Sequence, residues 1–391
     1  MPSFDKARLN RIGDWMQSYV DSRRLAGASV LIAQGGDEVY YHDCGLRDLS
    51  RGLPFERDTV ARIYSMTKPV TSVALMMLAE RGLFHLDAPV SEFIPAFKNM
   101  QCLLQGASAI DQVTPCATPT LHHLLTHTSG LSYPFNPGVL GAEMAERDII
   151  FRANQGTLAE MCDRTAALPL AFAPGARWEY SVSIDILGRV IEVVSGKTLE
   201  QFFIDEIFDP LGMNETRFSV CASARDRFAA CYTPQAGDAF SVGKVETGAD
   251  TLRQIDGSEV SPFLSASMQS GGGGLVGTID DDLKFTEMMR TGGAGIIGPK
   301  TLSFMMRNHL GGDIASMEGM GFGLGGAVLL DAGRARAPGN VGDFSWGGMA
   351  STFFWIDPVA DLSVIFFTQL IPSSAYPARP QLKALVHGAL T

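Results

Sequence analysis

Several patterns that mark other classes of protein are missing from this chain of 391 residues. There are only six cysteines and no C-x-x-C pair, which argues against a disulfide framework or a zinc site. The formal net charge is -11 and no basic cluster occurs, so nucleic acid and anionic membranes are poor partners. No apolar run reaches the length of a membrane span, and the N-terminus lacks the apolar core of a signal peptide. We therefore expect a cytoplasmic protein with reduced thiols.

Two further absences narrow the chemistry. The esterase motif G-x-S-x-G does not occur; the nearest match, around Ser345, has Asp343 in place of its first glycine. The run Gly271 to Gly274 is followed by neither G-K-[ST] nor a dinucleotide-binding pattern, which favours tight backbone packing over phosphate binding. We expect no cofactor.

Three histidines raise the possibility of a metal site. His123 and His127 are four residues apart, with His122 beside them, but no H-E-x-x-H arrangement is present and no third ligand is evident. Helix packing and turn capping explain these residues more simply, so we expect no metal.

The chain is long enough, with 46% hydrophobic residues, to bury a large core. The periodicity of its hydrophobic residues predicts helices and strands at both ends of the chain and mainly helices between them. At the two ends we expect helices at residues 6–24 and 380–389, and a third helix that begins near Ser65. The expected strands are 28–34, 38–44, 322–331, 350–356 and 362–370. In the middle, helices are expected near 141–154, 157–166 and 183–196, with 101–118 as an irregular loop.

These elements predict an α+β fold with a mixed, mainly antiparallel sheet assembled from both ends of the sequence. Residues 1–85 and 217–391 would form this sheet domain, with terminal helices on one face. Residues 86–216 would form a second, all-helical domain inserted on the other side. The oligomeric state is not predicted by any of these patterns.

A possible nucleophile stands at the start of the helix after the first hairpin. Ser65 and Lys68 are three residues apart, so their side chains share a helix face near unpaired N–H groups. Burial and the helix dipole both disfavour an ammonium there, so Lys68 can accept the serine proton. The S-x-x-K pattern is common, however, and occurs again at Ser3/Lys6 and Ser241/Lys244.

Two other stretches carry groups that a serine nucleophile needs. Tyr180 immediately precedes a helix and can point its phenol into a cleft to relay protons; a buried core tyrosine is the competing interpretation. Trp346, Gly347 and Gly348 stand at the entrance to the strand expected at 350–356, where the N–H of Met349 can join that of Ser65 in an oxyanion hole. A plain turn capped by an aromatic residue is the alternative.

The order of these motifs resembles the serine β-lactamase and penicillin-binding-protein superfamily. S-x-x-K, LLTHTSGL, Y-S-x before a helix, SGGGGLV and WGG before a strand occur in that order, between about residues 26 and 370. Within that superfamily the chain is most similar to the family VIII carboxylesterases, which share the class C β-lactamase fold.

The resemblance implies roles for individual residues. Ser65 would be the acylated nucleophile, Lys68 its general base or proton shuttle, and Tyr180 the proton relay. The Trp346–Gly348 stretch would line the substrate pocket, and Met349 would provide the second oxyanion N–H.

Two departures from true β-lactamases favour esters over β-lactams. Val182 stands where those enzymes carry an asparagine, and Trp346 stands where a cation helps to hold the substrate carboxylate. An apolar cleft results, which favours simple neutral esters. The resemblance therefore implies a serine carboxylesterase that acts on short-chain acyl esters of small molecules. A β-lactamase or D-Ala peptidase, an acyltransferase to an alcohol, and a non-catalytic binding relative remain alternatives.

Overall fold

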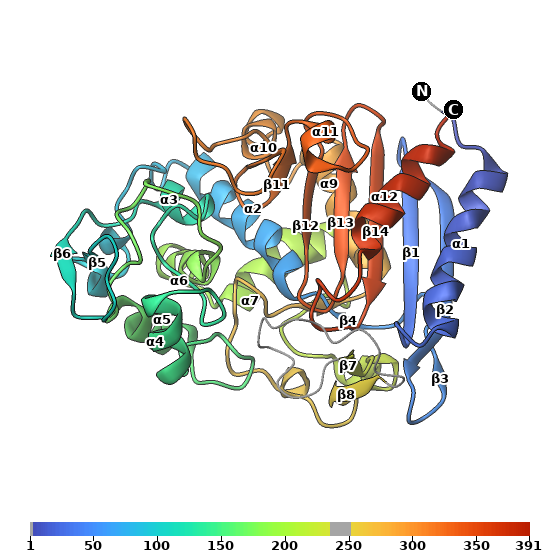
Figure 1. Cartoon of the computed structure of the whole chain (residues 1–391), viewed down its shortest axis with the longest axis horizontal. Coiled ribbons are helices and arrows are strands. Elements are labelled where there is room, and N and C mark those ends of the chain that lie inside the picture. The colour runs from blue at the N-terminus through green and yellow to red at the C-terminus, as the bar shows by residue number, and fades with distance from the viewer. Residues whose placement is uncertain (1–2, 235–251) are drawn as a thin grey trace.

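The computed structural model describes residues 3–234 and 252–391 and is built on one eight-stranded sheet (Figure 1). The strand order is β10-β11-β12-β13-β14-β1-β2-β3, and every neighbouring pair in this sheet is antiparallel. The strands are β1 Gly27–Gln34, β2 Asp37–Asp48, β3 Leu53–Pro54, β10 Met320–Phe322, β11 Ala327–Leu329, β12 Phe344–Gly347, β13 Phe353–Asp357 and β14 Leu362–Thr368. Both ends of the sequence thus meet in the sheet, as the sequence predicts.

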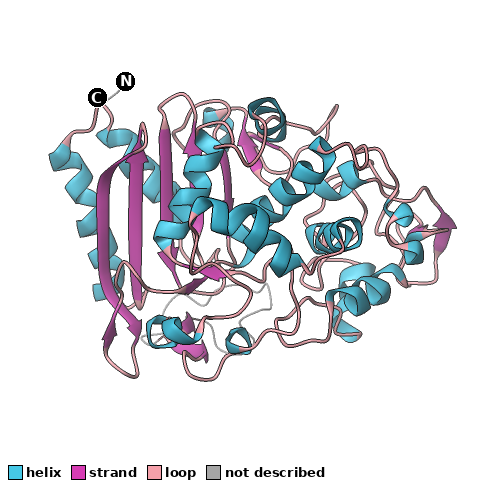
Figure 2. Ribbon diagram, turned by 180° about the vertical axis from the view of Figure 1, so that it is seen from behind, coloured by secondary structure: helices cyan, strands magenta, loops and turns pink. Residues whose placement is uncertain are grey.

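Both faces of this sheet are buried, and successive side chains of the central strands point alternately to one face and to the other. In β1, Val30 and Ile32 face helices α1 (Lys6–Asp21) and α12 (Ala378–Ala389), whereas Leu31 faces the opposite side. The period of two is what a pleated strand requires. Helix α9 (Ile279–Arg290) packs on that opposite face, seen from behind in Figure 2. The terminal helices therefore cover one face, and α9 covers the other.

Helix α2 (Thr67–Glu80) connects the sheet to the helical region and is buried along nearly all of its length. Figure 1 shows it running obliquely from beside the sheet to the region of α3. The α-helices of residues 86–216 are α3 Leu121–Leu125, α4 Val139–Glu146, α5 Leu158–Ala166, α6 Ser183–Ser195, α7 Leu199–Phe203 and α8 Asp209–Leu211, with a π-helical turn at Ile204–Phe208 between the last two. One continuous apolar core joins these helices to α2 and to the inner face of the sheet. We propose the division into domains 1–85 with 217–391 and 86–216 on the basis of secondary structure.

Smaller elements complete the described chain. The short strands are β4 Ala61–Arg62 with β9 Val276–Gly277, and β7 Cys231–Thr233 with β8 Arg253–Asp256. The remaining α-helices are α10 Pro299–Met305 and α11 Ala332–Ala335. Within the described ranges, no helix combines the length and the apolar character needed to cross a membrane.

Four sequence predictions of local structure were wrong. The strand expected at 322–331 is a hairpin, because a glycine-rich turn separates β10 from β11 and Gly325 there has φ of 94°. The strand expected at 350–356 begins only at Phe353, and a separate strand, β12, precedes it. The expected loop 101–118 contains the hairpin β5 Gln101–Leu103 and β6 Val113–Pro115, and the helix expected at 141–154 is the shorter α4.

Candidate active site

Ser65 lies in a 3-10 turn, Tyr64–Met66, that runs directly into α2. The residue before it, Tyr64, has φ of 43°, in the left-handed region that bulky residues seldom adopt. Lys68, one turn further along, places its Nζ 3.2 Å from Ser65 Oγ. The structure thus brings the predicted nucleophile and its predicted base within hydrogen-bond distance.

The Lys68 side chain is fully buried and its amine has three oxygen partners. Besides Ser65 Oγ, Nζ donates to the phenol oxygen of Tyr133 at 3.0 Å and to the carbonyl oxygen of Gly272 at 2.6 Å. These three oxygens hold the amine of Lys68 in a fixed position. Tyr133 was missed from the sequence, although it follows the LLTHTSGL motif by only two residues. Burial raises the pKa of Tyr133 well above its ordinary value, which keeps this phenol neutral.

Tyr180 donates a hydrogen bond of 2.7 Å to Ser65 Oγ. The loop that carries it, just before α6, is fixed by the segment that follows α3. The backbone N–H of Ser181 donates to Nδ1 of His127 at 3.3 Å, and Asn136 Nδ2 donates to the Tyr180 carbonyl at 2.8 Å. Burial lowers the pKa of His127 well below its ordinary value, so this imidazole is neutral and can accept at Nδ1. The LLTHTSGL motif therefore positions the tyrosine.

Asp185 supports the carbonyl that faces Lys68. This residue lies in the first turn of α6 and is 1% exposed. Its Oδ1 accepts from the backbone N–H of Gly272 at 2.9 Å and from Ser270 Oγ at 2.5 Å. Burial raises the pKa of Asp185, and the charge of Lys68 opposes that rise. A side chain at Gly272 would collide with the Asp185 carboxylate, which explains the glycine at this position.

The predicted Trp346–Met349 stretch lies at the end of β12, next to the turn that carries Ser65. Gly348 packs so closely on the carbonyl of Ile63 that a Cβ would collide with its oxygen. Its N–H donates to the carbonyl of Thr352 at 2.7 Å, which closes the turn into β13. This contact brings the Met349 backbone close to the nucleophile turn, and its role in an oxyanion hole remains a proposal.

Trp346 belongs to an aromatic wall beside the nucleophile. Its ring centroid lies 5.4 Å from that of Tyr180 and 5.2 Å from that of Phe322, while Trp178 lies 5.7 Å from Phe322. Val182, two residues after Tyr180, is fully buried in the main core. The surroundings of Ser65 on this side are therefore apolar.

The three histidines that raised a metal hypothesis have other contacts. The His123 side chain completes the capping box of α3 with Thr120, and His122 Nε2 lies 3.2 Å from Nδ1 of His309. His127 contacts Ser181, as described above. These are capping and packing roles.

One group elsewhere has ligand atoms close together. Asp343, Asp357 and His387 each have one atom that could bind a metal ion, and these three atoms lie within 4.8 Å of one another. However, Lys383 Nζ donates to Asp343 at 3.0 Å, and Asn340 Nδ2 donates to Asp357 at 2.8 Å. With a cation already present, the cluster is better described as a buried ion pair than as a metal site.

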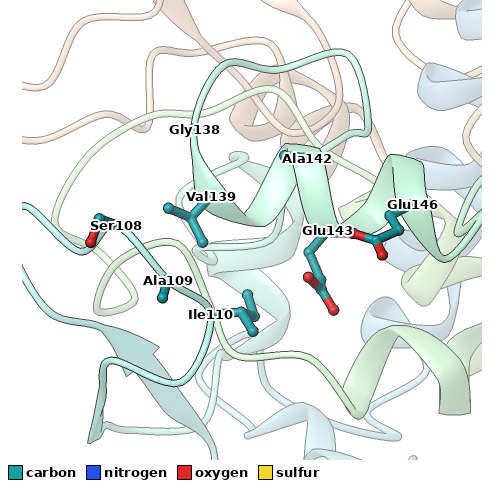
Figure 3. Close-up of a pocket in the computed structure, with 8 residues that line it drawn as sticks. All are labelled: Ser108, Ala109, Ile110, Gly138, Val139, Ala142, Glu143 and Glu146. Carbon is teal, nitrogen blue, oxygen red and sulfur yellow. The ribbon is translucent and has the colours of Figure 1, made fainter.

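The S-x-x-K copy at Ser3/Lys6 is not part of this arrangement. Ser3 bonds to the C-terminal Thr391, and Ser241/Lys244 lies outside the described residues. A hollow of about 590 Å³ lies in the helical region, lined among others by Val139, Glu143 and Glu146 (Figure 3). It is lined by none of the residues that surround Ser65.

Comparisons with known proteins agree with the fold and the motifs. The sequence model of the Beta-lactamase family matches residues 12–387. Esterase EstB of Burkholderia gladioli is 33% identical over 372 residues, which covers 93% of this chain and 90% of EstB. Monacolin J acid methylbutanoyltransferase of Aspergillus terreus is 27% identical over 381 residues, covering 90% of this chain and 88% of the other.

A solved structure leads to the same conclusion. EstCE1, a hydrolase with promiscuous acyltransferase activity, superposes with a TM-score of 0.80 at 30% identity and covers 97% of both chains. The α+β, β-lactamase-like fold expected from the sequence is thereby confirmed. Because the family match and the likeness to EstB and EstCE1 extend over nearly the whole chain, the chain belongs to the beta-lactamase family and, within it, to the family VIII esterases.

Proposed function

We propose that this chain is a serine carboxylesterase that hydrolyses short-chain acyl esters through an acyl-enzyme on Ser65. The observation that carries the proposal is the position of Ser65 Oγ, held between Tyr180 Oη at 2.7 Å and Lys68 Nζ at 3.2 Å. A hydroxyl placed between two groups that can accept and return its proton is the arrangement that nucleophilic catalysis requires. The resemblance to EstB and EstCE1 supports esters as the substrate class.

The mechanism has two steps. In the first, Ser65 Oγ attacks the ester carbonyl carbon, and its proton passes to the unit formed by Tyr180 and Lys68. The N–H groups of Ser65 and Met349 stabilise the oxyanion of the tetrahedral intermediate. The C–O bond to the alcohol then breaks, the unit returns the proton to the leaving oxygen, and the acyl group stays on Ser65.

In the second step, water attacks the acyl-Ser65 carbonyl. The Tyr180–Lys68 unit accepts a proton from that water and then donates it to Ser65 Oγ as the carboxylic acid leaves. Tyr133 and Gly272 hold Lys68 in place throughout, because both accept from its amine.

The test is the activity of a Ser65→Ala variant on 4-nitrophenyl butyrate. We expect hydrolysis to fall to background and the mass shift of a butyryl group to be lost in quenched samples. Ser303→Ala, at an exposed position on α10, is the matched control and should behave like the wild type. Full activity of Ser65→Ala, with labelling by a fluorophosphonate at another residue, would contradict the assignment.

A second candidate function is acyl transfer to an alcohol. It is favoured by EstCE1, a hydrolase with promiscuous acyltransferase activity, and by the similarity to an acyltransferase of Aspergillus terreus. Product analysis of 4-nitrophenyl butyrate turnover with added 1-propanol decides between them, because transfer gives propyl butyrate and hydrolysis gives butyrate. Nitrocefin tests β-lactamase activity, which the apolar Val182 and Trp346 disfavour.

We also propose a cytoplasmic location. It is supported by six cysteines that are all free thiols, as a reducing compartment allows.

A further inference from the structure

The loop that carries Tyr180 is held on both sides by the segment that follows α3. The backbone N–H of Glu179, just before the tyrosine, donates to the carbonyl of His127 at 2.9 Å. The N–H of Val182, two residues after the tyrosine, donates to the carbonyl of Ser132 at 3.3 Å. These two bonds fix the ends of the loop and leave the tyrosine itself between them.

Three polar side chains join the two segments. Asn136 Nδ2 donates to the carbonyl of Tyr180 at 2.8 Å and to Ser132 Oγ at 3.1 Å, which uses both hydrogens of the amide. Ser132 Oγ in turn donates to Oε1 of Glu179 at 2.6 Å, and Asn136 Nδ2 lies 3.4 Å from the same oxygen. Ser132 is 2% exposed and the Glu179 side chain is 19% exposed, so this cluster is largely shielded from water.

The carboxylate of Glu179 sets the direction of these hydrogen bonds. An ionised carboxylate only accepts, so the hydroxyl hydrogen of Ser132 points to Glu179 and its lone pairs are left for Asn136. The amide must then present its nitrogen to both Ser132 and the carbonyl of Tyr180. The other oxygen of Glu179 lies 3.4 Å from the exposed Arg177, and an ion pair of this kind contributes little. The inner oxygen is therefore the one that orders the cluster.

The same segment also contacts the other half of the proton relay. Tyr133, the residue after Ser132, accepts from Nζ of Lys68 at 3.0 Å. Its ring centroid lies 5.1 Å from that of Tyr180. A shift of this segment would therefore change the positions of both groups that face Ser65.

We propose that Glu179 is a positioning residue for the reaction. Through Ser132 and Asn136, its carboxylate holds the backbone of Tyr180. The phenol oxygen is thereby kept 2.7 Å from Ser65 Oγ. In the described part of the chain the carboxylate has no hydrogen bond to the nucleophile or to its base, so it acts through the tyrosine. The inference rests on the proposed esterase function and adds a residue to its machinery.

The test measures kcat and KM for 4-nitrophenyl butyrate in Glu179→Ala and Glu179→Gln. We expect Glu179→Ala to lower kcat roughly 10²-fold, because a small displacement of an aligned group is enough for such a loss. KM should stay close to the wild-type value, because no contact with the substrate is removed. Glu179→Gln keeps an oxygen acceptor in the same place and should recover most of the rate. Glu146→Ala, at an exposed position on α4, is the matched control and should behave like the wild type.

A charge at position 136 tests the direction of the hydrogen bonds. Asn136→Asp replaces both N–H donors by a second carboxylate beside Glu179, and we expect kcat to fall at least as far as in Glu179→Ala. Adding Glu179→Gln removes the like charge and supplies a new amide donor. The double variant should therefore be about tenfold more active than Asn136→Asp alone. Asn154→Asp adds the same charge at an exposed position and should leave kcat unchanged.

Thermal unfolding verifies that each variant is folded. Wild-type kcat in Glu179→Ala, a loss that appears only in KM, or a Glu179→Gln variant as slow as Glu179→Ala would overturn the positioning role. A double variant no more active than Asn136→Asp alone would overturn it as well, and this comparison decides if Glu179→Ala does not fold. Inactivity of the wild type on this ester, or full activity of Ser65→Ala, would instead overturn the proposed esterase function itself.

Discussion

The phenol oxygen of Tyr180 and the amine of Lys68 converge on one atom, Ser65 Oγ, at 2.7 Å and 3.2 Å. Lys68 reaches it from the first turn of α2, while Tyr180 comes from a loop 115 residues after Ser65. Tyr180 is the closer of the two, and Lys68 Nζ lies 4.7 Å from the centre of the Tyr180 ring. The two side chains are thus close enough to each other and to Ser65 to act as one proton-transfer unit.

Removing the phenol oxygen alone should therefore be costly for catalysis. We expect Tyr180→Phe to lower kcat for 4-nitrophenyl butyrate by about 10²- to 10⁴-fold, the usual contribution of a positioned acid–base group. The phenyl ring is kept, so its contacts with Trp346 and His127 should hold the fold. Steady-state kinetics and thermal unfolding measure the two effects. Activity near the wild-type level would show that Lys68 alone transfers the proton.

Tyr133 should contribute by holding the amine of Lys68. We expect Tyr133→Phe to lower kcat/KM by about tenfold, because Lys68 would keep Ser65 and Gly272 as partners and lose one hydrogen bond. The stacked contact of Tyr133 with Phe135 should remain. Kinetics of this variant and of the double variant with Tyr180→Phe form a cycle. Strictly additive effects would contradict a shared proton-transfer unit.

The sequence allowed the nucleophile helix to be predicted well because its signals are local. Pro69 in the first turn and Gly82 after the last turn mark the ends of α2, which spans Thr67–Glu80, and Gly82 has φ of 72°. The terminal helices and the first hairpin were predictable for the same reason. Their hydrophobic periods match the faces that they bury.

The strand that carries Trp346 could not be predicted in this way. Strand β12 is only four residues long and is stabilised by pairing with β11 and β13. Its sequence is therefore too short to show a clear alternation of hydrophobic and polar residues. The same limit applies to the glycine-rich turn between β10 and β11, where Gly325 packs against Ser72 of α2.

The supporting residues of the site depend on contacts that are distant in sequence. Lys68 and Gly272 are 204 positions apart, and Asp185 and Gly272 are 87 apart. A signal for Asp185 does exist, since it is an acidic residue between two buried isoleucines, Ile184 and Ile186. Such a residue needs a buried partner. The partner itself could not be identified without the fold.

Asp185 should act on the rate through the Gly272 carbonyl. We expect Asp185→Asn to lower kcat by about tenfold or more, because a neutral amide holds the Gly272 N–H more weakly and balances the Lys68 charge less well. Ser270→Ala should act in the same direction with a smaller effect, since Ser270 shares the same carboxylate oxygen. Kinetics at fixed pH measure both changes.

The pH profile separates this positioning role from a merely structural one. Burial raises the pKa of Asp185, so the carboxylate takes up a proton at a higher pH than an exposed aspartate does. Protonation removes the negative charge near Lys68, and we expect wild-type kcat to fall as the pH is lowered through that pKa. Asp185→Asn should lack this acid limb. If Asp185→Asn had a lower kcat but kept the acid limb of the wild-type pH profile, the positioning role would be contradicted.

A buried aspartate away from the site should make stability depend on pH. Asp282 in α9 is 7% exposed, and its Oδ2 has no partner in the described part of the chain. Burial and the neighbouring Asp281 raise the pKa of Asp282 from 3.8 to about 8. The folded protein therefore binds a proton that the unfolded chain has lost over this range, so the free energy of unfolding falls as the pH rises from about 4 to about 8.

Replacing this carboxyl by an amide should remove that dependence. We expect Asp282→Asn to be more stable than the wild type at about pH 8, by at least about 1 kcal/mol, and to differ little from it only below about pH 4. Asp163→Asn, at an exposed position on α5, is the control and should follow the wild type at both values. Urea unfolding at the two pH values measures the free energies. Equal stability of Asp282→Asn and the wild type at the higher pH would mean that the Asp282 carboxylate is stabilised in the folded protein, in contradiction to its raised pKa.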